Sequence, residues 1–338
     1  RITDFHKKQM PKNLSWKDDL EIELGWVWRP IDRVGVYVPG GKASYPSSAI
    51  MNIVPARVAG VENIVVASPS PDGAFNPLML YASTAMDVRK ILRVGGAQAV
   101  AALAFGTETI EKVHKITGPG NEYVAEAKRQ VFGRVGIDSV AGPSEVLLIS
   151  DKTMPEKIAA IDLLAQAEHD PNAQSILVTN DHNYALKVEK EINNYLQYLK
   201  RKEVAGLSWR NFGAIVIVPD FKKAIEVSNL IGPEHLQLCF KDAENYLEHV
   251  KSAGSIFLGY WSPEAMGDYM TGSNHVLPTN GTAKFSSSLS VFDFMKRVSI
   301  TKVNENGFKK LAPAVVRLAN SEGLQAHSLS VSERLKDL

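Results

Sequence analysis

Short apolar runs rich in β-branched residues alternate along this chain with longer segments of helical periodicity. The runs expected to be strands are Val34–Val38, Asn63–Ala67, Lys90–Val94, Val113–Ile116, Val146–Ile149, Ser175–Val178, Ala214–Val218, Leu236–Phe240 and Ser255–Leu258. The segments expected to be helices are Ser47–Ala59, Asn76–Val88, Ala97–Phe105, Glu122–Val131, Met154–Glu168, Tyr184–Leu199, Phe221–Leu230 and Ala243–Ser252. Apolar strands separated by helices are typical of parallel sheets covered on both faces. The pattern therefore predicts an α/β fold.

The connection A-G-P-S-E, at Ala141–Glu145, is a plausible crossing between two α/β units. We expect residues 37–149 to form one unit, and residues 150–288, completed by residues 1–36, to form the other. From Val291 the pattern changes to a short strand, V-S-I-T-K-V, and then to two helices. Residues 289–338 are therefore expected to form a small C-terminal helical tail.

Composition narrows the classes of function. The 338 residues are 45% apolar and 22% charged, which is ordinary for a soluble globular protein. The formal net charge of +1 argues against sequence-independent binding of nucleic acid. The sequence has neither an apolar run as long as a membrane span nor a signal peptide. We therefore expect a cytoplasmic protein, or a plastid one if the source is a plant.

Three glycine-rich loops follow predicted strands of the first unit: Y-V-P-G-G at 37–41, V-G-G-A-Q at 94–98 and T-G-P-G-N at 117–121. Glycine lets a backbone approach a phosphate closely, and ligands of parallel sheets bind beyond the carboxyl ends of the strands. Each loop alone is better explained as a tight turn, which uses glycine for steric reasons. Together they suggest a nucleotide site, although the usual G-x-G-x-x-G fingerprint is absent.

A second group of residues has the chemistry of metal ligands. Gln166 and His169 stand three apart in Q-A-E-H, hence on one face of a helix, and G-D-Y-M-T-G-S-N-H and Q-A-H follow later in the chain. Imidazole, carboxylate and amide oxygen suit a divalent first-row metal. The spacing matches no compact zinc motif, so surface polar groups remain an alternative at this point.

Glu234 and His235 stand side by side in I-G-P-E-H-L-Q-L-C-F, at the start of a predicted buried strand. Gly232 and Pro233 favour a turn that could bring both side chains to one place. Histidine can take a proton from an alcohol or water near neutral pH, and a carboxylate beside it can raise its pKa. A turn with two solvated polar residues is the alternative.

These blocks together resemble the L-histidinol dehydrogenase family. The resemblance runs from Trp28 to the C-terminus through R-V-G-V-Y-V-P-G-G, Y-P-S-S-A-I-M-N, G-G-A-Q-A-V-A-A-L-A-F-G-T, I-T-G-P-G-N, A-G-P-S-E-V-L, L-L-A-Q-A-E-H-D, G-P-E-H-L, G-S-N-H-V-L-P-T and E-G-L-Q-A-H. It implies oxidation of L-histidinol through bound L-histidinaldehyde to L-histidine, with two NAD and one zinc ion per subunit. It also implies two incomplete, doubly wound Rossmann-like α/β domains, of which the first binds NAD, followed by the small C-terminal helical tail.

The resemblance assigns roles residue by residue. The zinc ligands would be Gln166, His169, Asp268 and His327. The metal would orient the substrate through its imidazole and amino nitrogens. His235 would be the general base in both oxidations, and Glu234 would help to activate the water that adds to the aldehyde. Further contacts would be made by Ser144, His275 and Glu322 to the substrate and by Tyr37, Gln98 and Asn121 to NAD.

Members of the family are homodimers, so we expect the tail to complete the partner's site with Glu322 and His327. Family members also carry a longer N-terminal stretch, and we expect this chain to be N-terminally incomplete, at a cost in dimer geometry and stability. The alternatives are a dehydrogenase of another small alcohol such as a hydroxysulfonate, a zinc hydrolase, a two-domain binding protein without turnover and an inactive fragment.

Overall fold

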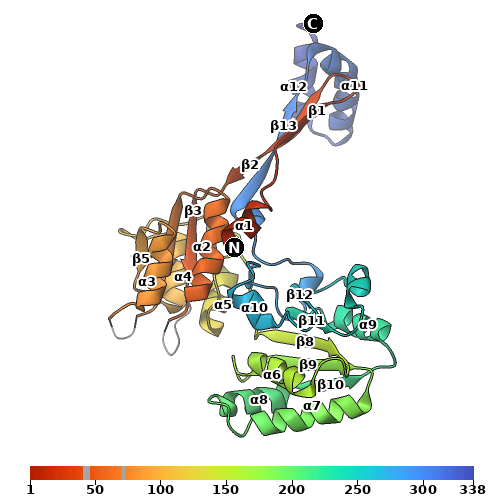
Figure 1. Cartoon of the computed structure of the whole chain (residues 1–338). Helices are drawn as coiled ribbons and strands as arrows, with labels where there is room; N and C mark the ends of the chain where they lie inside the picture. The colour runs from red at the N-terminus through yellow and green to blue at the C-terminus, as the bar shows by residue number, and fades with distance from the viewer. Residues whose placement is uncertain (41–45, 71–72) are drawn as a thin grey trace. The chain divides into compact units, whose positions relative to one another are not determined.

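The computed structural model describes residues 1–40, 46–70 and 73–338 of the chain. It divides into two compact units (Figure 1). The first consists of Arg1–Met10 and Ile31–Phe294, and the second of Pro11–Pro30 and Met295–Leu338. The two α/β sheets both belong to the first unit.

The sheet nearer the N-terminus has five parallel strands in the order β5-β4-β3-β6-β7. These are β3 (Arg33–Tyr37), β4 (Asn63–Ala67), β5 (Lys90–Leu92), β6 (Lys115–Thr117) and β7 (Gly136–Ile137). The connecting helices are α2 (Pro46–Val58), α3 (Pro77–Ala85), α4 (Gly96–Phe105) and α5 (Glu122–Val131). Strand order runs outward from β3 in both directions, which is the doubly wound arrangement of Rossmann-like folds, with five strands instead of six.

The second sheet is also parallel and has the order β10-β9-β8-β11-β12. Its strands are β8 (Glu145–Ser150), β9 (Gln174–Thr179), β10 (Ala214–Ile217), β11 (His235–Cys239) and β12 (Ser255–Leu258). The helices between them are α6 (Glu156–Ala167), α7 (His182–Tyr195), α8 (Lys202–Phe212), α9 (Phe221–Ile231) and the 3-10 helix η1 (Ala243–His249). Figure 1 shows α6, α7 and α8 together beside this sheet.

Alternation along the central strand explains why both faces of the second sheet are covered. Val146 and Leu148 of β8 pack with residues of α6, α7 and α8, while Leu147 and Ile149 pack with residues of α9 and η1. Successive side chains of a strand point to opposite faces, so an apolar run without polar interruptions needs two apolar layers. Burial on both faces fixes the position of β8 and of its neighbour β11.

Shorter elements complete the first unit: α1 (Ile2–Lys7), α10 (Glu264–Tyr269), and the 3-10 helices η2 (Thr282–Lys284) and η3 (Val291–Phe294). A buried amide joins several of these segments. Nδ2 of Asn274 donates to the carbonyl of Met51 at 2.7 Å and lies 3.2 Å from Nε2 of His6. The segment after α10 is thereby attached to both α1 and α2.

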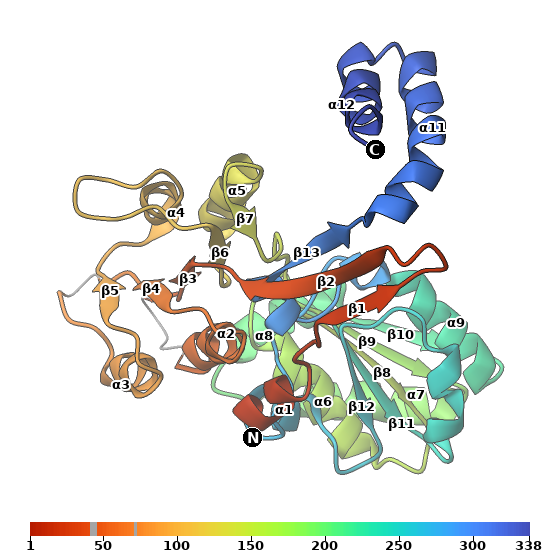
Figure 2. The ribbon, with the colours of Figure 1, turned by 90° about the horizontal axis from the view of Figure 1, so that it is seen from above.

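The second unit contains an antiparallel sheet in the order β1-β2-β13 and a pair of helices. Its elements are β1 (Leu14–Lys17), β2 (Glu23–Pro30), β13 (Met295–Lys302), α11 (Glu305–Ser321) and α12 (Gln325–Leu335). Figure 2 shows α11 and α12 as a helical hairpin. In the described part of the chain, no helix combines the length and the apolar character needed to cross a bilayer.

The predicted α/β class, the two parallel sheets and the helical C-terminal region are confirmed. The grouping of residues 1–36 with the second α/β unit is different in the structure. Residues 33–36 lie in the central strand of the first sheet, because Val34-Gly35-Val36 pairs with both β4 and β6. Residues 23–30 instead pair with β13 over eight positions.

Replacing Leu148 by alanine is expected to lower the free energy of unfolding by about 2–5 kcal/mol, because the side chain is fully buried in the central strand. Leu230→Ala is the control, since Leu230 is 77% exposed on α9 and its loss should cost no more than about 0.5 kcal/mol. Urea unfolding of both variants measures the difference. Equal losses would show that burial in this sheet does not determine stability.

Candidate functional site

The turn between α9 and β11 delivers an acid and an imidazole to the start of a buried strand. Gly232 ends α9 in the left-handed conformation, with φ of 68°, and its N–H donates to Ser228. Pro233 follows, which cannot continue a helix. β11 then begins at His235, so Glu234 and His235 lie at the amino edge of the sheet, and both are buried.

The ring of His235 is held in one tautomer by the neighbouring strand. Its Nδ1 lies 2.9 Å from the carbonyl oxygen of Glu145, the first residue of β8. A carbonyl oxygen can only accept, so Nδ1 carries the proton of this hydrogen bond. Nε2 is buried, has no hydrogen-bond partner among the described residues and lies 3.7 Å from Oδ1 of Asp268. The nitrogen left to exchange a proton is therefore Nε2.

The same strand edge holds the carboxylate of Glu234. Its Oε2 accepts from the backbone N–H of Glu145 at 2.8 Å and lies 3.6 Å from Nδ1 of His235. Glu145 itself is buried, and its Oε1 accepts from the backbone N–H of Asn280 at 2.8 Å. The peptide groups on either side of Glu145 thus position both members of the acid–imidazole pair.

Asp268 brings residues from α10 and the segment after it to the same place. In addition to its contact with His235, its Oδ1 lies 4.0 Å from Nδ1 of His275. Nδ1 of His275 also donates to the backbone carbonyl of Asp268 at 3.0 Å. His275 is thereby oriented by the residue whose carboxylate it faces.

Three side chains form a group that could hold a metal ion. His169, Glu264 and Asp268 each place one ligand atom within 4.8 Å of the others. Gln166 joins them through Glu264: with its amide nitrogen turned inward it donates to Oε2 of Glu264 at 3.0 Å and also contacts Oε1. The reverse orientation would set acceptors against acceptors. This arrangement leaves the amide oxygen of Gln166 available as a ligand.

Opposing effects set the pKa of His235. Burial lowers it, but the carboxylates of Glu264, Asp268 and Glu234 outweigh burial and raise the pKa of His235 to about 10. Burial also works against ionisation of Asp268, yet His235 and the other imidazoles around it lower the pKa of Asp268 overall. The raised pKa of His235 and the lowered pKa of Asp268 favour opposite charges on the two side chains, which lie close enough to form an ion pair.

The two remaining acids are perturbed in the opposite direction. Burial raises the pKa of Glu234 to about 7 and that of Glu264 to about 8, more than the nearby His235 lowers either. His169 is solvent-exposed as a residue, yet partial burial lowers its pKa, and burial also lowers the pKa of His275. Both rings therefore favour the neutral form that binds metals.

The glycine-rich loops follow β3, β5 and β6, at the carboxyl edge of the first sheet. Contacts converge on Tyr37, whose hydroxyl accepts from the N–H of Gly96 at 3.1 Å, and whose carbonyl oxygen would lie 2.0 Å from a Cβ at Gly118. Asn121 caps α5 by accepting from the N–H of Val124. Gln98 is exposed on α4. Gly41, in the first loop, lies outside the described residues.

The other expected site residues lie as follows. Ser144 immediately precedes Glu145, and its carbonyl accepts from Gln174 at 2.9 Å, while no contact of its hydroxyl is seen in the described part of the chain. Glu322 caps the end of α11, and His327 lies in α12. Both are exposed residues of the second unit, whereas the cluster around His235 belongs to the first.

Two buried acids of this cluster were missed from the sequence. Glu264 precedes Asp268 by four residues, and this spacing places both on one face of α10. This spacing could have indicated a pair of acids on one helix face, but P-E-A-M-G-D contains no recognised ligand motif. Glu145 was passed over in favour of Ser144 in A-G-P-S-E. Its role is carried mostly by its backbone, which side-chain chemistry does not reveal.

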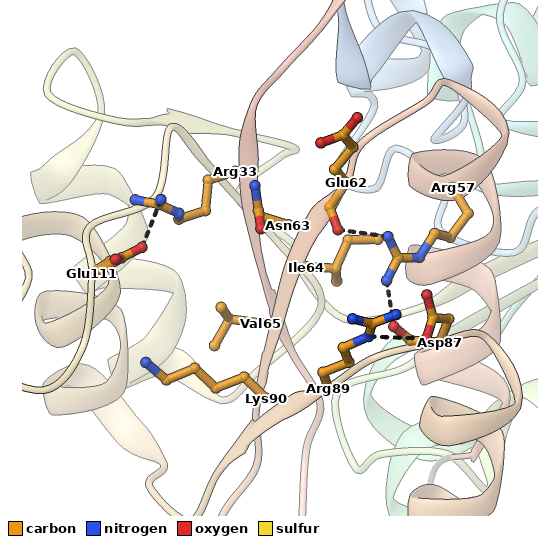
Figure 3. Close-up of a pocket in the computed structure, with 10 residues that line it drawn as sticks. All are labelled: Arg33, Arg57, Glu62, Asn63, Ile64, Val65, Asp87, Arg89, Lys90 and Glu111. Atoms are coloured by element: carbon orange, nitrogen blue, oxygen red, sulfur yellow. Dashed lines mark hydrogen bonds and ion pairs between the residues drawn. The ribbon is translucent and has the colours of Figure 1, made fainter.

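A hollow of about 460 Å³ lies elsewhere, among charged residues at the amino ends of β3, β4 and β5 (Figure 3). Its basic side chains are already engaged with protein groups. Arg57 donates to the carbonyls of Val61, Glu62, Met86 and Asp87, and Arg33 pairs with Glu111 at 2.6 Å. These contacts tie the loops that follow α2 and α3, so we regard the hollow as structural.

Comparison with known proteins gives a consistent result. The family model described as histidinol dehydrogenase matches residues 1–335. The histidinol dehydrogenase of Cereibacter sphaeroides is 54% identical over 338 residues, covering 100% of this chain and 78% of the relative. That of Brucella suis is 55% identical over 336 residues, covering 99% and 78%.

A crystal structure of histidinol dehydrogenase from Elizabethkingia anophelis superposes with a TM-score of 0.95 at 41% identity, covering 99% of this chain and 78% of that chain. A propionaldehyde dehydrogenase from Rhodopseudomonas palustris is also similar, with a TM-score of 0.55 at 10% identity, covering 88% and 78%. At that identity the likeness concerns the fold alone.

Replacing Glu264 by glutamine is expected to weaken binding of a divalent metal about 10- to 100-fold, because the carboxylate lies in the ligand group and orients the amide of Gln166. Glu189→Gln, on the exposed surface of α7, is the matched control and should leave affinity unchanged. Competition between the protein and a coloured chelator measures both. Equal affinities in the two variants would place the metal elsewhere.

Proposed function

Because this chain belongs to the histidinol dehydrogenase family, we propose that the cluster around His235 oxidises L-histidinol in two successive steps. The chain is an NAD-dependent oxidoreductase of the last step of histidine biosynthesis, with histidinol and NAD as its substrates. The proposal assigns the chemistry to particular residues. The observation that carries it is the buried Nε2 of His235, which makes no hydrogen bond with the described residues and faces Asp268 at 3.7 Å, while Nδ1 is held by the carbonyl of Glu145.

In the first step, Nε2 of His235 takes the hydroxyl proton of L-histidinol, while a hydride passes from the carbon that bears the hydroxyl group to the nicotinamide of NAD. The product is L-histidinaldehyde, which stays bound. Nδ1 keeps its own proton throughout because it donates to Glu145. The backbone of β8 therefore sets which nitrogen acts.

In the second step, Glu234 takes a proton from a water molecule as its oxygen adds to the aldehyde carbon, and His235 returns the proton it took in the first step to the aldehyde oxygen, which gives the hydrate. His235 takes a proton from the hydrate that forms, a hydride passes to a second NAD, and L-histidine results. A carboxyl group whose pKa is about 7 suits this task, because about half of it is ionised at neutral pH and the carboxylate is still basic enough to accept a proton. NAD must be exchanged for NADH between the steps.

The donor set fits zinc: an amide oxygen from Gln166, an imidazole from His169 and a carboxylate from Asp268, with Glu264 beside them. His327 is proposed as the fourth ligand. When bound, the zinc ion would orient the imidazole and amino nitrogens of the substrate, and its charge would lower the pKa of His235 toward the neutral form that a base requires. His275, fixed by the carbonyl of Asp268, and Ser144 would contact polar groups of the substrate.

NAD is proposed to bind at the glycine-rich loops of the region 37–149. Tyr37, Gln98 and Asn121 stand at the carboxyl edge of the first sheet, where nucleotides bind in doubly wound folds. The hydrogen bond between Tyr37 and Gly96 supports this site, because it joins two of the loops. The loops would accept the phosphates through backbone N–H groups.

We further propose a homodimer in which the tail completes the partner's site. Glu322 of the partner subunit would bind the substrate, and His327 of the partner subunit would ligate zinc. Exposed apolar side chains on the second unit support this assignment, among them Val298, Leu318 and Leu329. The cytoplasmic location expected from the sequence stays a prediction.

Exchanging His235 for asparagine is expected to slow oxidation of both L-histidinol and L-histidinaldehyde by about 10²- to 10⁴-fold, the usual contribution of a general base. Glu234→Gln should slow the aldehyde reaction far more than the alcohol reaction. Rates measured separately from the two substrates test the assignment. If E234Q slowed both reactions equally, the division of roles between the two residues would be wrong.

The aldehyde reaction should also depend on pH through Glu234. Burial raises its pKa to about 7, so the carboxylate is the minor form below that pH and the major form above it. The rate should therefore rise as pH increases toward about 7 and level off beyond it. The pH profile of E234Q should lack this limb; an unchanged limb would assign it to another group.

Composite sites make a prediction for mixed dimers. Glu322→Gln and Asp268→Asn subunits should each be inactive, yet a dimer of one with the other contains one intact site, formed from the unchanged half of each. Activity should return when the two variants are dissociated and reassociated together. Failure to regain activity in dimers verified to be mixed would contradict a site shared between subunits.

A further inference from the structure

A buried ion pair lies beneath one of the glycine-rich loops. Lys128 of α5 and Asp138, the residue after β7, contact each other through Nζ and Oδ1. Their side chains are 3% and 5% exposed, respectively. Such a pair is a poor source of stability, because removing two charges from water costs about as much as their attraction returns. Its presence under the loop T-G-P-G-N therefore calls for another explanation.

The pair holds both backbone groups of one loop residue. Nζ of Lys128 donates to the carbonyl oxygen of Gly118 at 3.0 Å, and the N–H of Gly118 donates to Oδ2 of Asp138 at 2.8 Å. The two peptide groups that flank Gly118 are thus each hydrogen-bonded to a charged side chain, one to the cation and the other to the anion. Hydrogen bonds that involve charged groups are stronger and more directional than neutral ones.

Gly118, in the loop T-G-P-G-N, also lies against the end of β3. Its φ of 110° is strained for any residue with a side chain, and a Cβ there would lie 2.0 Å from the carbonyl oxygen of Tyr37. A small movement of Gly118 would therefore change its distance from Tyr37. Three residues later Asn121 caps the start of α5, the helix that carries Lys128, so the loop is connected to the ion pair through this helix as well.

We propose that the Lys128–Asp138 pair positions the loop at Gly118 relative to β3, so that Tyr37 and Asn121 can contact the same NAD molecule. Because both side chains are almost fully buried, they would act on NAD through Gly118 and without touching the cofactor. This inference rests on the proposed NAD site and adds to it the residues that determine its geometry. It predicts that breaking the pair impairs NAD binding and leaves the binding of L-histidinol unchanged.

Three variants separate positioning from simple stability. K128M and D138N each leave one buried charge without its partner, so both should unfold at lower temperature than the wild-type protein. K128M/D138N removes both charges, and the asparagine can still accept from the N–H of Gly118. The double variant should therefore be more stable than either single one. It still lacks the donor to the carbonyl of Gly118.

The measurements are KM for NAD and for L-histidinol, and equilibrium binding of NADH by fluorescence. In all three variants the affinity for NADH should fall, and KM for NAD should rise, by about tenfold or more. KM for L-histidinol should stay within twofold of wild type. Leu148→Ala is the control, since it lowers stability in the second sheet without touching the loop, and its KM for NAD should not change. The double variant carries the test if a single variant fails to fold.

Unchanged NADH affinity in a folded double variant would overturn the positioning role. Recovery of NADH affinity in the double variant, in parallel with its stability, would also overturn it, because the pair would then act through stability alone. The proposed function fails separately, if the wild-type protein neither binds NADH nor reduces NAD with L-histidinol.

Discussion

The hydrogen bond from Nδ1 of His235 to the carbonyl of Glu145 joins the fold to the chemistry. It exists because β11 lies beside β8 in parallel register, with His235 opposite Val146. One strand therefore supplies the carbonyl that fixes the imidazole tautomer, and also the N–H that holds Glu234. A slip of one residue would reverse the faces of β11 and separate Glu234 from its donor.

The two sheets present different edges to their ligands. The glycine-rich loops lie at the carboxyl edge of the first sheet, as is usual for doubly wound folds. The acid–imidazole pair instead lies at the amino edge of the second, where β8 and β11 begin. Gln166 and His169 reach the same edge from the end of α6, and Asp268 from α10. Helix ends and short segments can thus form a site at the amino edge of a parallel sheet, although ligands usually bind at the carboxyl edge.

The sequence predicted the buried strands of the two parallel sheets well because their apolar runs are uninterrupted, and β4 and β12 begin and end where expected, whereas β1, β2 and β7 were not expected. Residues 202–212 were not expected to be helical, and the predicted helix at 243–252 is a 3-10 helix ending at His249. Propensity is weak in such short polar segments, so packing decides. Chemistry-bearing residue types flagged His235 and Asp268, whereas the backbone role of Glu145 and the buried Lys128–Asp138 pair depend on contacts between distant segments.

The central claim is that one cluster carries out both oxidations with a metal-oriented substrate. The most direct measurement is the number of NADH molecules formed per L-histidinol consumed, first with zinc present and then after chelation. We expect two NADH molecules per L-histidinol with zinc, and loss of NADH formation on chelation that is reversed by adding zinc back. One NADH per substrate, or two that persist without zinc, would contradict it.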